Sequence, residues 1–343
     1  MAIWTPGFVI NKGKIKKMSN GMADSSSGRE DERKRHSLLV DFFIRLVKEK
    51  PLGTVGAVIT LLLLLTGIFA DFLAPYGMNE QFLTDRLAAP SARFWLGTDN
   101  LGRDMLSRVI FGARISVIVG LAATALATII SVIIALLSGY ISGKFDLIVQ
   151  RFVDAWMCLP WLVILMVVIS LVGPGMLTLI IAIGISWGIG GSRTARSAVI
   201  AIKENVYIQA AVAIGCPTSR ILTRHILPNI MAPTIILFSI WVPAIILAEA
   251  SLSFLGFGIP APAPSWGGML AGRGRSFMFM APWMVIWPGL ALAIVVYGIN
   301  MFGDAVRDLL DPRLRGGVGR YGMRAKKEAK VKVTGVTTHN KGG

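Results

Sequence analysis

A stretch of 38 residues without a charged side chain occupies positions 155–192 and has the sequence AWMCLPWLVILMVVISLVGPGMLTLIIAIGISWGIGGS. A single helix of this length would extend about 57 Å, whereas the hydrocarbon core of a bilayer is about 30 Å thick. Gly173-Pro174-Gly175 interrupts the stretch near its middle, and this combination of residues is typical of a turn. The stretch therefore predicts a hairpin of two membrane-spanning helices, at about 152–172 and 176–194.

The rest of the chain contains four more uncharged runs of spanning length. Hydrophobic residues make up 54% of the 343 positions and charged residues only 16%, against about 25% charged residues in an ordinary soluble domain. This composition excludes a soluble or disordered protein. We therefore predict an all-α membrane protein with six transmembrane helices, of which the other four lie at about 52–75, 115–139, 230–255 and 282–303.

The charged residues are distributed unevenly between the two sides that six spans define. The formal net charge is +16, and 28 of the 35 Lys and Arg residues fall on one side, mainly in the tails 1–51 and 305–343. Basic residues stay on the cytoplasmic side of a membrane protein, so both termini are predicted to be cytoplasmic and residues 76–112 extracytoplasmic. The basic excess then indicates orientation, with contact to the lipid bilayer, and predicts no nucleic-acid partner.

The predicted cytoplasmic segment 203–228 has a helical pattern of its own. Residues 207–214 are Ala-rich and contain no helix breaker. Gly215 is suited to cap this helix because glycine adopts the left-handed conformation at low cost. Pro217 suits the first turn of a second short helix, and Pro228 is predicted to end that helix.

The small side chains of Ala210 and Ala211 would make the first of these helices slim enough to enter a groove on another protein. A simple connector is the alternative. The strings QAAVAIG (209–215) and HILPN (225–229) resemble the EAA loop of ABC importer permeases. Gln209 stands where that family has Glu, which preserves hydrogen-bonding capacity and removes a charge.

Three further strings carry the same resemblance: WLGTDNLGRDMLSRVIFGARIS (95–116), EASLSFLGFGIPAPAPSWGGML (249–270) and NMFGDAVRDLLDPR (300–313). Together the four strings are similar to the C-type permease subunit of a dipeptide, oligopeptide or nickel ABC importer. The resemblance implies a type I ABC importer permease fold, with the ABC transmembrane type-1 domain at 113–304. It also implies a bacterial or archaeal cytoplasmic (inner) membrane as the location.

In that family, the loop forms a coupling helix that docks on an ATP-hydrolysing subunit. Carried over to this sequence, the coupling residues are Tyr207, Gln209, Ala210, Ala211, Gly215 and Pro228. The implied partners are a second homologous permease subunit, one or two ATP-binding subunits and an extracytoplasmic substrate-binding protein. ATP and magnesium would be bound by the partner subunits and not by this chain.

Two acidic residues fall within predicted spans, where an uncompensated charge is costly. Asp154 lies three positions after Arg151, so the two side chains share a helical face and predict a structural ion pair. Glu249 has no such neighbour within its span. We interpret Glu249 and Ser253 as candidate pore or gate residues, with a structural bond to another span as the alternative for Glu249.

Two extracytoplasmic segments carry further patterns. Arg103, Arg108 and Arg114 recur at helical spacing before the second span, which indicates either an interfacial helix whose arginines meet lipid headgroups or a contact surface for a partner protein. The Pro- and Gly-rich residues after Glu249 are expected to fold over the outer mouth of the pore. Ser265 is expected to begin a short interfacial helix.

The sequence carries no recognisable catalytic motif. It contains no phosphate-binding loop, HExxH, CxxC or nucleophile elbow, so we predict neither an enzyme nor a metal site. The function that these features favour is half of the pore of an ATP-driven importer for a peptide or related solute. The alternatives are an ion-coupled secondary transporter that uses Asp154 and Glu249, and a membrane scaffold whose basic tails bind lipid.

Overall fold

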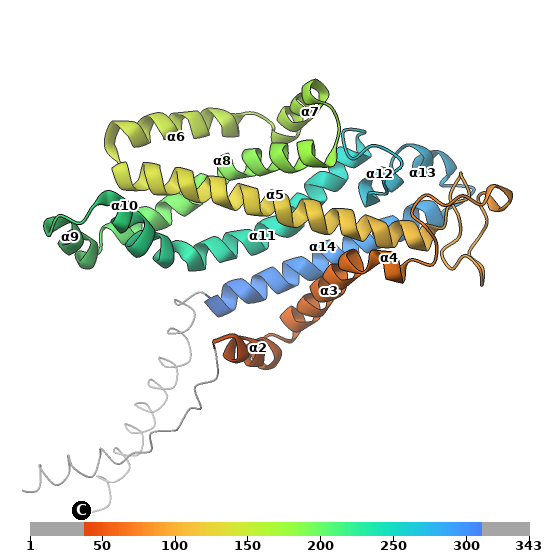
Figure 1. Cartoon of the computed structure of the whole chain (residues 1–343), viewed down its shortest axis with the longest axis horizontal. Helices are drawn as coiled ribbons and strands as arrows, with labels where there is room; N and C mark the ends of the chain where they lie inside the picture. The colour runs from red at the N-terminus through yellow and green to blue at the C-terminus, as the bar shows by residue number, and fades with distance from the viewer. Residues whose placement is uncertain (1–37, 311–343) are drawn as a thin grey trace, which may run out of the picture. The chain divides into compact units, whose positions relative to one another are not determined.

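The computed structural model describes residues 38–310, and the tails 1–37 and 311–343 lie outside the described residues (Figure 1). The chain divides into two units, residues 1–43 and 44–343. Among the described helices, only α2 begins in the first unit, at Leu38, and all the others belong to the second.

The described residues contain helices and no β-strand. The helices are α2 (Leu38–Glu49), α3 (Pro51–Ile68), α4 (Ala70–Leu73), a 3-10 turn (Leu83–Asp85), α5 (Met105–Ile141), α6 (Gly143–Cys158), α7 (Trp161–Val172), α8 (Met176–Lys203), α9 (Val206–Ala213), α10 (Thr218–Arg220), a π-helical turn (Ile221–Ile226), α11 (Leu227–Phe254), α12 (Trp266–Leu270), α13 (Gly272–Phe277) and α14 (Trp283–Leu310).

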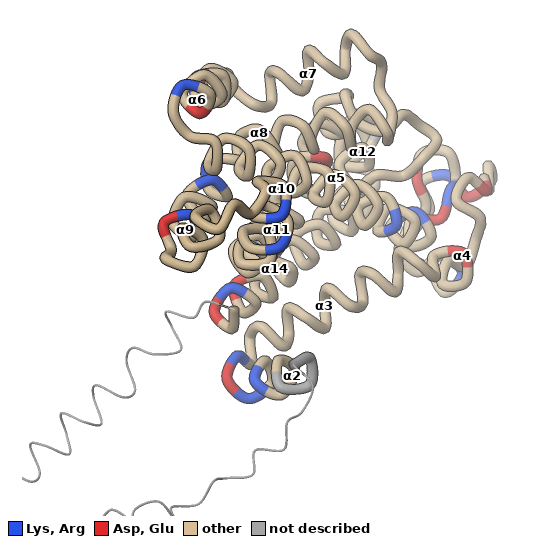
Figure 2. Tube along the Cα trace, turned by 60° about the vertical axis from the view of Figure 1, so that its left-hand side comes forward, with Lys and Arg blue, Asp and Glu red and all other residues tan. Residues whose placement is uncertain are grey.

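Five helical segments are long and apolar enough to cross a membrane. They are α3, α5, α8, the continuous segment Thr218–Phe254 and α14, and the bent pair of α6 and α7 supplies a sixth if the pair counts as one span. Charged residues gather toward the ends of these helices, and the middle part of each helix carries almost none (Figure 2). The described part of the chain is therefore an all-helical bundle with five or six candidate transmembrane helices.

The two ends of the bundle carry different structures. One end, called the loop end, contains residues 203–228 with α9 and α10 (Figure 1). The opposite end, called the cap end, contains residues 74–104 and 255–282, with α12 and α13.

The third predicted span is not a continuous helix. The structure breaks it between Cys158 and Trp161, and the axes of α6 and α7 differ by 88°. The prediction of one helix over 152–172 is therefore wrong at this point. The cause is Pro160, which forces the preceding residue out of the helical region: Leu159 has φ −85° and ψ 137°.

Pro228 does not end the second helix of the loop, contrary to the prediction. Residues 218–254 form one continuous helical segment, in which Pro228 lies in the first turn of α11. The π-helical turn before it changes the hydrogen-bond spacing, so the N–H of Leu227 donates to the carbonyl of Leu222, five residues back. A proline is tolerated there because the π-helical turn already interrupts the regular α-helical hydrogen bonds just before it.

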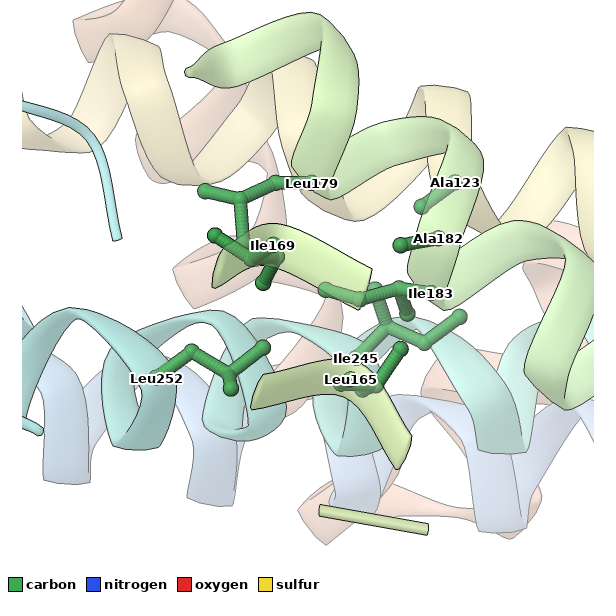
Figure 3. Packing of buried hydrophobic residues seen from close by; sticks show 8 residues of the cluster. All are labelled: Ala123, Leu165, Ile169, Leu179, Ala182, Ile183, Ile245 and Leu252. Carbon is green, nitrogen blue, oxygen red and sulfur yellow. The ribbon is translucent and has the colours of Figure 1, made fainter. Parts of the chain in front are cut away.

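The hairpin predicted from Gly173-Pro174-Gly175 is present as a turn between α7 and α8. Side chains of α7, α8 and α11 meet in a buried hydrophobic cluster, joined by one alanine of α5 (Figure 3). The cluster consists of Ala123, Leu165, Ile169, Leu179, Ala182, Ile183, Ile245 and Leu252. Although the chain bends between α6 and α7, α7 is thus fixed to the bundle by packing.

Glycine allows close approach between spanning helices at several contacts. A Cβ atom at Gly56 of α3 would lie 2.4 Å from the carbonyl oxygen of Gly298 in α14. At Gly188 of α8, a Cβ would lie 2.9 Å from the carbonyl oxygen of Ala127 in α5. Such contacts are typical of helices packed in a membrane, where van der Waals contact replaces the hydrophobic effect.

Candidate functional site

The loop end presents helix α9 with an apolar surface facing outward. The side chains of Val206 and Ile214 are 79% and 84% exposed, and Val212 is also exposed, whereas Ile208 is buried in the bundle. Ile208 attaches the helix, and most of the other apolar side chains on and just after it remain uncovered. Uncovered apolar side chains on a short helix are typical of a surface that binds another protein.

Gly215 ends α9 in the way that its position in the sequence predicts. It has φ +75°, its N–H donates to the carbonyl of Val212 at 3.0 Å, and the N–H of Cys216 donates to the carbonyl of Ala211 at 3.0 Å. This pair of bonds is a Schellman motif, which requires a left-handed residue at the position of Gly215. No heavy atom lies within 4 Å of a Cβ built at Gly215, so the backbone conformation alone requires glycine.

The other predicted coupling residues lie on or near α9 but do not all face outward. The side-chain amide of Gln209 donates to the carbonyl of Glu204 at 3.2 Å, so it binds within the loop. The hydroxyl of Tyr207 accepts a bond of 3.2 Å from Asn229. Ala210 and Pro228 are exposed, and Ala211 is half-buried.

The cap end contains a cavity of about 920 Å³, called the cap cavity. Ser253 at the end of α11 lines it, together with residues 258–263 and with Asp99, Arg103 and Arg108. Glu249 does not line the cavity: its side chain is buried, with 1% exposed, and one carboxylate oxygen accepts a bond of 2.6 Å from the Ser253 hydroxyl. Of the two candidate pore residues, only Ser253 reaches the cavity.

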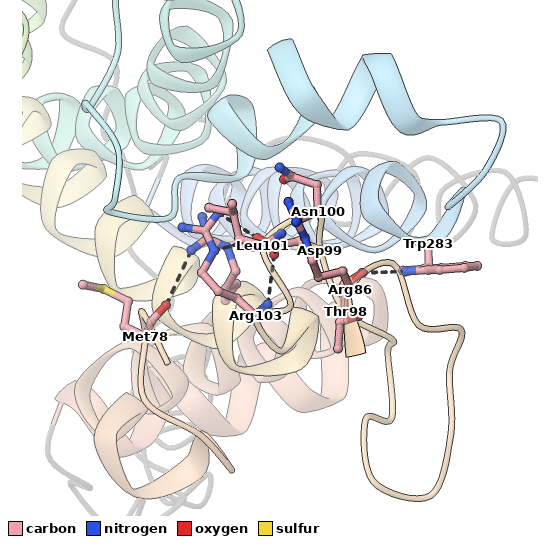
Figure 4. A network of polar contacts seen from close by, with 9 residues as sticks. Met78, Arg86, Thr98, Asp99, Asn100, Leu101, Arg103 and Trp283 are labelled. Carbon is pink, nitrogen blue, oxygen red and sulfur yellow. Dashed lines mark hydrogen bonds and ion pairs between the residues drawn. The ribbon is translucent and has the colours of Figure 1, made fainter. Parts of the chain in front are cut away.

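Asp99 is the centre of a buried polar network at the cap end, called the Asp99 network (Figure 4). One of its oxygens accepts bonds from the N–H groups of Leu101 (2.8 Å) and Arg103 (2.9 Å). The other accepts a bond of 2.7 Å from Nε of Arg103 and lies 3.7 Å from Nε of Arg108. The indole N–H of Trp283 joins the same segment by donating to the carbonyl of Thr98 at 3.0 Å.

For Arg103 and Arg108, the Asp99 network argues against the first of the two interpretations, contact with lipid headgroups. The side chains of Arg103 and Arg108 are only 11% and 9% exposed, because both are paired with Asp99 inside the protein. Arg114 is more exposed, at 30%, and pairs with Asp71 at 2.6 Å. The signal in the sequence that sequence reasoning missed is Asp99 itself, four residues before Arg103.

The predicted interfacial helix after Ser265 is also buried. The hydroxyl of Ser265 caps α12 by accepting a bond of 3.1 Å from the N–H of Gly268. The indole of Trp266 is buried and donates to the carbonyl of Val109 in α5 at 3.0 Å. The start of α12 therefore packs onto the bundle and not along a lipid surface.

Asp154 lies 3.8 Å from Arg151, its predicted partner, and makes a closer ion pair with Arg193 of α8. A second pair, between Asp146 and Arg196, also connects α6 with α8, and its Nε–Oδ1 distance is 2.7 Å. Sequence reasoning missed both α8 arginines because they lie 39 and 50 positions from their partners. Asp154 and Asp146 thus each form an ion pair between α6 and α8.

Metal-ligating side chains do not gather anywhere in the described residues, where no group of three or more His, Cys, Asp or Glu could hold an ion. The described geometry thus provides a surface for a partner, a cavity at the opposite end and helices that connect the two.

The sequence matches two protein families. Residues 127–316 match the family described as "Binding-protein-dependent transport system inner membrane component", and residues 37–90 match the "N-terminal TM domain of oligopeptide transport permease C".

Curated relatives match most of the chain. It is 37% identical to the dipeptide transport system permease protein DppC of Bacillus subtilis over 308 residues, which cover 90% of this chain and 93% of the relative. It is 36% identical to the oligopeptide transport system permease protein OppC of Bacillus subtilis over 293 residues, covering 85% and 95%. It is 35% identical to the glutathione transport system permease protein GsiD of Pectobacterium atrosepticum over 276 residues, covering 80% and 91%. The chain therefore belongs to the binding-protein-dependent transport system inner membrane components, the permease subunits of ABC importers.

Proposed function

We propose that this chain forms half of the translocation pore of an ATP-driven importer for short peptides. The dipeptide and oligopeptide permeases of Bacillus subtilis match 90% and 85% of this chain, which supports peptides as the substrate class. The pore would be completed by a second, homologous permease subunit. An extracytoplasmic binding protein would deliver the substrate, and one or two partner subunits would bind ATP and magnesium.

The observation that carries this proposal is the set of exposed apolar side chains on and just after α9 at the loop end. The loop end faces the cytoplasm in our proposal because the basic residues concentrate on that side and in the two tails. There, α9 would dock as the coupling helix on an ATP-binding subunit, with Val206, Val212 and Ile214 entering its groove. The cap end and its cavity would face the binding protein.

Gly215→Pro tests this role of the loop. Proline fixes φ near −65° and lacks an N–H, whereas Gly215 needs φ +75° and donates to Val212. We expect the variant to insert into the membrane and to lose ATP-dependent peptide uptake in proteoliposomes that contain the whole complex. Retained association with the ATP-binding subunits and normal uptake would contradict the proposal.

Gly143→Pro is the matched control. Gly143 also has a left-handed conformation, with φ +64°, and a Cβ there would have no neighbour within 4 Å, but it is the first residue of α6. The same backbone conflict at Gly143 should leave the ATP-binding subunits attached. Uptake by this chain alone, driven by a proton gradient without ATP, would instead support the ion-coupled alternative.

A further inference from the structure

The break between α6 and α7 opens onto a pocket of about 580 Å³. Four of the nine tryptophans in the chain line it, and each comes from a different helix. The pocket, called the tryptophan pocket, is lined by Trp156 of α6, Trp161 of α7, Trp187 of α8 and Trp241 of α11, together with Cys158, Pro160, Ser186, Gly190, Gly191 and Thr194. Its volume falls within the range of roughly 300–1,000 Å³ that is typical of small-ligand sites.

Packing holds the indole rings of the tryptophan pocket in place. The rings of Trp161 and Trp187 form an edge-to-face pair with centroids 4.9 Å apart and planes at 77°. The ring of Trp241 lies against the backbone of α8, where a Cβ at Gly191 would come within 2.2 Å of it. The aromatic walls are thus set by contacts within the protein before any ligand enters.

The helix break argues against lipid as the occupant of the pocket. Pro160 has no N–H and Leu159 is extended, so the break interrupts the regular series of helical hydrogen bonds. The N–H of Leu159 donates to the carbonyl of Trp156 instead, and the carbonyl of Pro160 begins the bonding of α7. Irregular backbone at membrane depth is tolerated where it is buried in protein or lines a water-filled cavity, but not where it faces acyl chains. In transporters, discontinuous spanning helices are typical of the places where substrates bind.

We propose that the tryptophan pocket receives a large apolar side chain, aromatic in particular, of the peptide during its passage. This inference rests on the proposed function and adds a substrate preference to it. Indole rings bind such side chains by edge-to-face and offset contacts. The indole N–H groups and the Ser186 and Thr194 hydroxyls supply polar atoms for the peptide backbone.

Cysteine labelling provides a direct test, because Cys158 lines the pocket and Cys216 lies in the loop. The Cys216→Ser variant would be reconstituted with its partner subunits in proteoliposomes. The rate at which a small maleimide labels Cys158 would then be measured during ATP hydrolysis, with either Ala-Phe or Ala-Ala present. Any cysteines of the partner subunits are replaced. We expect Ala-Phe to slow labelling severalfold and Ala-Ala to leave it unchanged. Equal rates with both dipeptides would overturn the inference.

Transport kinetics provide a second measurement that does not depend on the cysteine. Trp161→Leu keeps the site apolar and removes one aromatic ring. The KM for Ala-Phe should therefore rise roughly three- to tenfold, as expected for the loss of one aromatic pair. The KM for Ala-Ala should stay the same. Trp161→Phe should restore most of the difference. Tyr297→Leu, which removes an exposed ring of α14 outside the pocket, should change neither value.

The outcomes separate the two proposals. If the wild-type complex takes up neither dipeptide with ATP, the proposed function is wrong and the ligand assigned to the pocket falls with it. If both dipeptides are taken up and Trp161→Leu changes both KM values equally, only the tryptophan pocket inference is overturned. Quenching of pocket fluorescence by brominated acyl chains, with no protection by Ala-Phe, would assign the pocket to lipid and overturn the inference as well.

Discussion

Removing the carboxylate of Asp99 should release the segment that forms the wall of the cap cavity. The Asp99 side chain is 4% exposed and faces Arg103 and Arg108, which are 11% and 9% exposed. It also accepts two backbone N–H bonds, from Leu101 and Arg103. Asp99→Ala would therefore leave two buried guanidinium groups and two N–H groups without their acceptor.

The size of the effect follows from the burial of the pair. Breaking a buried ion pair by removing one partner costs about 3–5 kcal/mol, because the remaining charge stays in a poorly solvated site. At 1.36 kcal/mol per factor of ten, this corresponds to a roughly 150- to 5,000-fold increase in the population of the locally open state. Asp99→Asn should lose most of the same free energy, since it keeps an oxygen acceptor but not the charge.

Hydrogen exchange measures this opening without requiring global unfolding. The amide of Phe82 donates to the carbonyl of Gly102, and the amide of Leu87 donates to the carbonyl of Asp99, so both report on the segment through its backbone. We expect exchange at these two amides to accelerate by the factor above in Asp99→Ala. Exchange in the middle of α5 should remain at its wild-type rate.

The matched control is Asp85→Ala in the same part of the chain. Asp85 pairs with Arg93 at 3.0 Å, but these side chains are 33% and 56% exposed. An exposed pair of this kind contributes only about 0–1 kcal/mol, so exchange should change by about fivefold or less. An acceleration below about tenfold in Asp99→Ala, or equal effects of the two variants, would refute the reasoning.

Three further predictions concern other contacts. Gly56→Ala should destabilise the packing of α3 against α14 by about 1–3 kcal/mol, because its Cβ would lie 2.4 Å from a backbone oxygen; a lower thermal midpoint of the purified complex would show this. Glu249→Gln should keep the bond from Ser253 and near-normal ATP-driven uptake, whereas Glu249→Ala should reduce both uptake and thermal stability. If Glu249→Gln reduced uptake more than Glu249→Ala did, the result would indicate that transport depends on the negative charge of the carboxylate. The hydrogen bond from Arg114 lowers the pKa of the Asp71 carboxyl, so its stabilising contribution is present above the ordinary carboxyl pKa and is lost as the pH falls through the lowered value. In Arg114→Gln, NMR titration of the Asp71 carboxyl carbon should show a raised pKa.

Features set by neighbouring residues could be predicted from the sequence. The turn at Gly173-Pro174-Gly175 separates α7, which ends at Val172, from α8, which begins at Met176. Gly215 caps α9 because a left-handed residue is needed there and the chain provides glycine at that position. In both cases, the conformational preferences of a few adjacent residues determine the structure.

Proline shows where such local reasoning fails. Pro160 separates two helices, whereas Pro233 and Pro243 lie within α11 and Pro288 lies within α14. Neighbouring helices can compensate for the lost hydrogen bond in a membrane bundle. The contacts that a proline makes with neighbouring helices therefore decide whether it breaks a span, and these contacts cannot be derived from the local sequence.

The ion pairs could not be predicted for a related reason. Proximity in the sequence pairs Arg151 with Asp154, but Arg193 makes the closer contact from another helix. The spacing of the cap-end arginines indicates contact with lipid or with a partner protein, and nothing in that spacing shows that Asp99 pairs with Arg103 and Arg108 inside the protein. The tryptophan pocket is of the same kind, since its four rings come from positions up to 85 residues apart.

The segment Thr218–Phe254 extends without interruption from the loop end to the cap end. Its 37 residues span about 55 Å at 1.5 Å per residue, so one helical segment has its first turn in the loop and its last turn at the cap cavity, which Ser253 lines. Under the proposed function, a tilt of residues 218–226 would displace Ser253 directly. The π-helical turn at Ile221–Ile226, Pro233 and Pro243 interrupt the regular hydrogen bonds of this segment. The stiffness of the segment at these positions would set how much of a movement at one end of the bundle reaches the other.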